Sequence, residues 1–81
     1  MDSKLQQEKL KMWQDKLTIL EKELAEITQR RGEAAREGDL RENAAYQMAT
    51  EDQETWRVRI DEVKRIIANI EAREEALKRA A

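Results

Sequence analysis

The sequence contains no cysteine and no histidine. Their absence excludes disulfides, zinc sites built on thiolate or imidazole, cysteine nucleophiles and histidine general bases. Any bound metal must therefore be held by oxygen. Proline and phenylalanine are also absent and only two glycines are present, so the residues that punctuate turns, sheets and layered folds are scarce. We expect a chain that is almost entirely helical.

Long apolar runs and an excess of one charge are missing as well. No stretch approaches the roughly 20 apolar residues that cross a bilayer, and none follows the first residues as a signal peptide would require. We therefore expect a cytoplasmic protein with no membrane partner. The 16 Lys and Arg residues are interspersed with 18 Asp and Glu residues, giving a net charge of -2. This balance argues against direct DNA or RNA binding.

Apolar residues recur at spacings of three and four along two long stretches, which predicts two amphipathic helices. The first stripe contains Leu10, Trp13, Leu17, Leu20, Leu24 and Ile27, in phase with Arg31 and Ala34. The second contains Tyr46, Ala49, Gln53, Trp56, Ile60, Val63, Ile67, Ile70 and Leu77. A short connection forces two such helices to run antiparallel.

We therefore predict an all-α fold, a long antiparallel two-helix coiled-coil hairpin that forms a single domain over residues 1–81. The helices should cover about residues 3–37 and 42–79, with a tight acidic turn at about 38–41. Facing residues should have numbers that sum to about 80, which pairs Leu20 with Ile60 and Trp13 with Ile67. Helices of this length make a rod about 50 to 57 Å long, with no room for an enclosed pocket.

A second apolar pattern lies outside these stripes. Leu5, Met12 and Ile19 recur every seven residues, and Ile66 is a comparable residue on the second helix. We interpret the four residues as a surface for self-association or docking. Scattered apolar surface residues, which are common on soluble proteins, are the alternative.

The connection carries the most specific signal. It contains Gly-Asp-Leu-x-Glu-Asn-Ala-x-Tyr, from Gly38 to Tyr46, and seven of the nine positions are specified. The pattern resembles the N-terminal coiled-coil domain of the Gre transcript cleavage factors, GreA and GreB, which bind bacterial RNA polymerase. Similar flanking positions extend the resemblance over about residues 10–70: Arg30, Arg31, Ala35, Arg36, Glu37, Ala49, Glu51, Gln53, Arg59, Ile60 and Glu62.

The resemblance implies that the hairpin enters the secondary channel of the polymerase and that its acidic tip reaches the active centre. There Asp39 and Glu42 would help to hold the polymerase's second Mg²⁺ and an attacking water, so that the polymerase cleaves backtracked RNA. The chain would then be no enzyme by itself and would need no cofactor of its own. It could stimulate cleavage or compete with full-length factors.

The same residues also fit a purely structural interpretation. Asp39 followed three residues later by Glu42 matches a helix capping box, and Gly38 matches a C-cap glycine. In this alternative the hairpin pairs into a homodimeric helical bundle and the tip only caps helices. The motif residues Gly38, Leu40, Asn43 and Tyr46 are expected to shape the tip. Leu40 and Tyr46 would pack against Ala34, and Asn43 would order the loop or assist the carboxylates.

Three departures from the family pattern stand out. One residue is missing between the Ala-Arg-Glu and Gly-Asp-Leu segments, which rotates the first helix by about 100° relative to the tip, so Arg36 is assigned no role. Arg41 places a cation between the two acids. The chain ends at Ala81 without a counterpart of the family's C-terminal globular domain. Met1 and the alanine-rich end fit a complete short chain, and an excised domain is the alternative.

Overall fold

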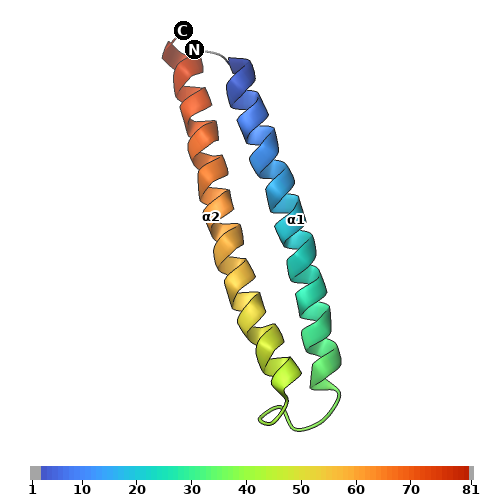
Figure 1. The fold of residues 1–81 in the computed structure, drawn as a ribbon. Helices are drawn as coiled ribbons and strands as arrows, with labels where there is room; N and C mark the ends of the chain where they lie inside the picture. The colour runs from blue at the N-terminus through green and yellow to red at the C-terminus, as the bar shows by residue number, and fades with distance from the viewer. Residues whose placement is uncertain (1–2, 81) are drawn as a thin grey trace.

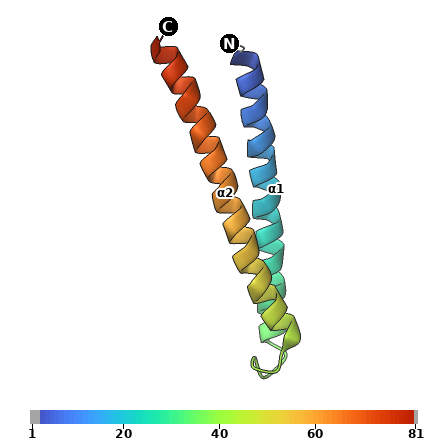
Figure 2. The same ribbon diagram turned by 60° about the vertical axis from the view of Figure 1, so that its left-hand side comes forward.

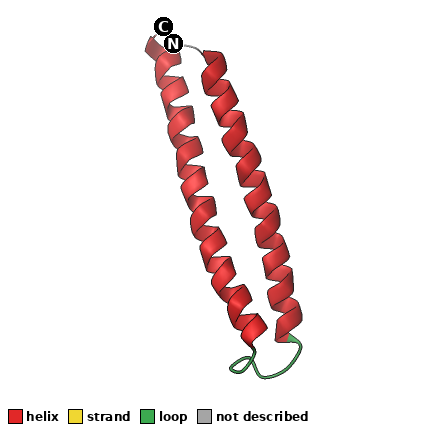
Figure 3. Ribbon diagram, in the orientation of Figure 1, coloured by secondary structure: helices red, strands yellow, loops and turns green. Residues whose placement is uncertain are grey.

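The protein folds into two long helices joined at one end. The computed structural model describes residues 3–80, which form α1 (Ser3–Ala35) and α2 (Ala44–Ala80). The helices run antiparallel, so that the start of α1 and the end of α2 lie opposite the connecting loop (Figure 1). The molecule measures 61 × 15 × 12 Å. The described residues contain helices and loop but no strand, which confirms the predicted all-α hairpin (Figure 3).

The loop is longer than the sequence pattern indicates. It occupies residues 36–43 instead of about 38–41, because α1 ends two residues earlier and α2 begins two residues later than expected. Two backbone hydrogen bonds between residues three apart end α1. The Arg36 N–H donates to the Glu33 carbonyl at 3.2 Å, and the Glu37 N–H donates to the Ala34 carbonyl at 3.1 Å. Such bonds between residues three apart tighten the last turn of a helix.

The core is a single seam between the helices. Its buried apolar residues all belong to the predicted stripes: Leu20, Ile27, Ala34, Ala49, Ile60, Val63 and Ile67. Partly buried side chains pack against the middle of this seam: Leu10, Trp13, Leu17, Leu24 and Trp56. In Figure 2 the ribbons overlap near the loop and lie apart at the opposite end, whereas in Figure 1 they run side by side, so the two helices are not exactly parallel.

Polar contacts across the seam agree with the predicted register. The Gln53 Nε2 donates to the Thr28 hydroxyl at 2.9 Å, and the numbers of these two residues sum to 81. Gln53 is only 4% exposed, so this hydrogen bond satisfies an amide that would be costly to bury unpaired. The outer faces of both helices are largely charged and exposed. Neither helix within residues 3–80 has the length and apolarity of a membrane span.

Candidate functional site at the hairpin tip

Asn43 joins the two helix ends at the tip. Its Oδ1 accepts the Tyr46 N–H at 3.0 Å, which makes Asn43 the N-cap of α2. Its Nδ2 donates to the Ala34 carbonyl at 2.6 Å in the last turn of α1, and this carbonyl also accepts the Glu37 N–H. One side chain therefore caps the second helix and binds the end of the first. Of the two roles expected for Asn43, the structure supports ordering the loop.

The capping-box interpretation of Asp39 and Glu42 is wrong. α2 begins at Ala44, so Asp39 lies five residues before the first helical residue and cannot cap it. Instead the Asp39 Oδ1 accepts the Arg41 N–H at 3.0 Å, a local turn typical of aspartate. The Glu42 N–H donates to the Asp39 backbone carbonyl at 3.2 Å. These bonds fold the loop into a small turn that carries both acidic side chains.

Arg31 ties the helices together one turn below the loop. Its Nη2 donates to the Tyr46 hydroxyl at 2.6 Å, and its Nε donates to the Thr50 hydroxyl at 3.0 Å. The guanidinium carbon also lies 4.8 Å from the centre of the Tyr46 ring. The three side chains, hereafter the Arg31 latch, are all partly buried. Tyr46 therefore has Arg31 as its polar partner at the tip.

The two remaining shaping residues behave differently. Gly38 has a φ of +137°, a backbone conformation that residues with a side chain rarely adopt, and it lies three residues after the end of α1. Leu40, within the loop of residues 36–43, is 41% exposed, so much of its side chain is not packed against the hairpin. The Arg41 carbonyl accepts a hydrogen bond from Gln47 Nε2 at 3.0 Å, which anchors the loop to α2.

The acidic side chains are open to solvent. Asp39 and Glu42 are both exposed, and Asp39 makes a 3.7 Å ion pair with the Arg41 Nε. The Arg41 side chain is 93% exposed, so this pair contributes little to stability. Both contacts of the Asp39 carboxylate use Oδ1, and within residues 3–80 neither its Oδ2 nor the Glu42 carboxylate has a protein partner. Both acids are therefore available to an external ligand.

The two tip acids, Asp39 and Glu42, do not make up a metal site by themselves. Mg²⁺ prefers six oxygen ligands in octahedral geometry and commonly retains waters in protein sites. Within residues 3–80 no three acidic side chains lie close enough together to hold a metal ion. Two exposed carboxylates suit a shared site in which the other ligands come from a partner. The donor type fits the metal, and the number of donors requires help from outside the chain.

Comparison with protein families identifies the hairpin. The family model described as the N-terminal domain of the transcription elongation factors GreA and GreB matches residues 4–72. The chain belongs to this family. Comparisons with curated proteins and with solved structures gave no match. The match covers most of the chain, including the whole tip, α1 from residue 4 and α2 up to residue 72, and it confirms the family resemblance carried by the Gly38–Tyr46 motif.

The residues predicted for self-association lie far from the tip of this Gre-family hairpin. Leu5, Met12 and Ile19 are 49%, 57% and 59% exposed on the outer side of α1. Ile66 is partly buried, and it lines a shallow groove between the helices together with Gln6, Lys9, Asn69, Ile70 and Arg73. The first three residues thus form an exposed stripe, and Ile66 lies at the edge of a groove instead.

Sequence reasoning assigned no role to Arg31 or Thr50. In the sequence Arg31 is in phase with the first stripe and is one of the flanking positions of the family resemblance, but neither observation names a partner for it. A charged residue at a seam position close to the turn was the available signal. It indicates a buried polar contact, because the seam would otherwise leave the charge without a partner.

Proposed function

We propose that the hairpin acts as a Gre-like elongation factor domain that inserts its tip into the secondary channel of bacterial RNA polymerase and stimulates cleavage of backtracked RNA. One observation carries the proposal. Asp39 and Glu42 are exposed on a braced loop at the end of a narrow rod, and neither acts as a helix cap. Among the described residues, the fold uses only the Asp39 Oδ1, which contacts Arg41, and leaves the Asp39 Oδ2 and the Glu42 carboxylate without a partner.

The shape of the molecule supports insertion. The Cα trace is 61 Å long and 15 by 12 Å across, and the loop of residues 36–43 joins the two helices at one end of it. A body of this shape can enter a narrow channel and place that loop deep inside. The Asn43 contacts and the Arg31 latch fix the loop relative to both helices, so that the acids arrive in a set geometry. Such preorganisation lowers the entropic cost of positioning catalytic groups.

The chemistry suits the residue types. When bound beside a scissile phosphodiester, a second Mg²⁺ stabilises the attacking and leaving oxygens. Asp39 Oδ2 and the Glu42 carboxylate would contribute oxygen ligands to a metal held mainly by the polymerase, and could orient the attacking water. The hairpin would thus supply groups to the polymerase's own active centre. This division of labour agrees with a tip motif that contains two acids, Asp39 and Glu42, and no nucleophile with an adjacent base.

The decisive assay uses backtracked bacterial elongation complexes with 5'-labelled RNA and Mg²⁺. We expect the protein to accelerate shortening of the RNA, and the Asp39→Asn/Glu42→Gln double variant to lose the effect while its circular dichroism spectrum stays unchanged. Glu37→Gln is the matched control, because Glu37 is an exposed acid on the same loop outside the motif. It should retain full stimulation.

Three outcomes separate the alternatives. Full stimulation by the double variant would show that the carboxylates are not the active groups. A wild-type protein that gives no cleavage but displaces a full-length cleavage factor would be a competitor that binds the channel. No cleavage and no displacement would mean that this family member does not act through the channel.

A further inference from the structure

The exposed apolar stripe on α1 has no role in the seam between the helices or in the proposed action of the tip. Leu5, Met12 and Ile19 repeat every seven residues, about 10.5 Å apart along the helix, and each is about half exposed. They lie outside the seam that holds the hairpin together. We propose that this stripe is a homodimer interface in which the α1 helices of two copies lie parallel and in register.

Charged residues border the stripe on both sides. On a helix, the residues three and four positions away from a given residue flank it on the surface. One flank of the stripe therefore consists of Glu8, Asp15 and Lys22, and the other consists of Lys9, Lys16 and Glu23. All six are exposed except Glu23, which is partly buried. Beside each of the three stripe residues, the two flanking residues carry opposite charges.

This arrangement selects one orientation of a second copy. When two helices pair in parallel about a two-fold axis, each flank faces the opposite flank of the other copy. Glu8 then lies level with the partner's Lys9, and Asp15 lies level with the partner's Lys16. Lys22 likewise faces the partner's Glu23. Each pair occurs twice by symmetry, so all flanking charges are matched across the interface.

An antiparallel arrangement is disfavoured by the same residues. There each flank faces its own counterpart running in the reverse direction. With Met12 at the centre, Glu8 approaches the partner's Asp15 and Lys9 approaches the partner's Lys16. Both contacts bring like charges together, which destabilises an interface. The charge pattern thus favours a parallel second copy.

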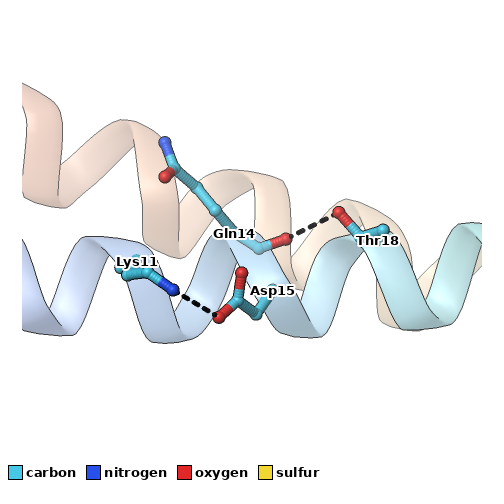
Figure 4. A network of polar contacts seen from close by, with 4 residues as sticks. All are labelled: Lys11, Gln14, Asp15 and Thr18. Carbon is cyan, nitrogen blue, oxygen red and sulfur yellow. Dashed lines mark hydrogen bonds and ion pairs between the residues drawn. The ribbon is translucent and has the colours of Figure 1, made fainter.

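The isolated hairpin leaves these groups available. Asp15 accepts an ion pair from Lys11 Nζ at 3.4 Å on its own helix, beside a hydrogen bond from the Thr18 hydroxyl to the Gln14 carbonyl (Figure 4). The Lys11 and Asp15 side chains are 78% and 66% exposed, so the pair is weak and can be exchanged. Lys9 lines the same groove as Ile66. Ile66 would therefore lie at the edge of the proposed dimer interface.

Parallel pairing leaves the tip uncovered. The stripe ends at Ile19, 17 residues or about 25 Å before the loop begins at residue 36. Both tips would point in the same direction, away from the joined ends. The dimer therefore does not depend on the proposed action on polymerase, and it does not block the tip.

Single-cysteine variants test the orientation directly, because the chain has no cysteine of its own. In a parallel, in-register dimer Leu5→Cys should form a disulfide with its own copy, and so should Ile19→Cys. In an antiparallel dimer each variant alone should fail, and a disulfide should form only when the two are mixed. Val58→Cys, 58% exposed on α2, is the control for random collision. The proposal expects both stripe variants to cross-link at least tenfold faster than this control.

Sedimentation equilibrium gives an independent readout. The weight-average mass should rise with concentration from 9.6 kDa toward twice that value. Lys16→Asp should lower the dimer fraction by opposing two acids, and Asp15→Lys/Lys16→Asp should restore it by exchanging the pair. A mass that stays at 9.6 kDa at all concentrations, cross-linking no faster than Val58→Cys, or cross-linking only in the mixture would overturn the proposal.

Discussion

The guanidinium of Arg31 lies over the ring of Tyr46 and donates to its hydroxyl at 2.6 Å. Arg31 is in the last full turn of α1 and Tyr46 is in the first turn of α2, so the contact closes the hairpin directly below the loop. The same arginine also binds Thr50 on α2. The tip is thus held by a polar layer in addition to the apolar seam.

Loss of the Arg31 latch should loosen the tip. We expect Arg31→Met to lower the free energy of unfolding by about 2 kcal/mol, because two hydrogen bonds and the ring contact are lost. Tyr46→Phe keeps the ring and should cost about 1 kcal/mol. Urea denaturation of both single variants and the double variant measures the coupling. Additive effects would show that the two side chains do not stabilise each other.

The two hydrogen bonds of Asn43 can be separated by substitution. Asn43→Asp keeps the side-chain oxygen that caps α2 but replaces the amide Nδ2, which donates to the Ala34 carbonyl, with a second oxygen. Asn43→Ala removes both bonds and should lower stability by about 1 to 2 kcal/mol. We expect the aspartate variant to lie between wild type and alanine in thermal unfolding. An aspartate variant as unstable as alanine would assign the main role to the Ala34 contact.

The two glycines should respond in opposite directions to alanine substitution. Gly38→Ala forces a side chain into a positive φ and should cost about 1 to 3 kcal/mol, although no atom lies within 4 Å of the added group. Gly32 lies inside α1 and also has no atom within 4 Å, so Gly32→Ala should gain about 0.5 to 1 kcal/mol. Chemical denaturation measures both. Equal effects would contradict the backbone assignment at Gly38.

Neighbouring residues on α1 should differ sharply in their contribution to the fold. Leu20 is 7% exposed in the seam, and Leu20→Ala should cost about 2 to 5 kcal/mol by leaving a cavity. Ile19 is 59% exposed, and Ile19→Ala should change the stability of the monomer by less than about 0.5 kcal/mol. Both free energies of unfolding should be measured at low protein concentration, where association of two copies does not contribute. A large loss for Ile19→Ala would place that residue in the core.

The fold could be predicted because its physical basis is periodic. Each buried apolar residue of the seam is part of a run with spacings of three and four, and the scarcity of glycine and proline leaves little choice but helix. The pairing of the two stripes then follows from the position of the turn. The cross-seam hydrogen bond between Thr28 and Gln53 agrees with the register obtained in this way.

The tip was harder to predict because several side chains compete for the same caps. Asp39, Asn43 and their neighbours can all accept a backbone N–H, and the capping-box pattern at Asp39 and Glu42 favoured the wrong one. Asn43 is the N-cap of α2, and its amide Nδ2 also donates to the Ala34 carbonyl. This contact joins residues nine apart, so local spacing does not reveal it. The loop lengthens as a result, and both acids stay outside the helix.

The single seam has a consequence for how the molecule opens. Within residues 3–80 no third element packs against the two helices, so each layer of the seam is supported only by the layers above and below it. In such nearly one-dimensional structures, local unfolding proceeds from an end. The loop keeps the residues beside it close together even when they separate, whereas the chain ends drift apart freely. The hairpin should therefore unzip from its termini, and the acidic tip should be the last part to lose its shape.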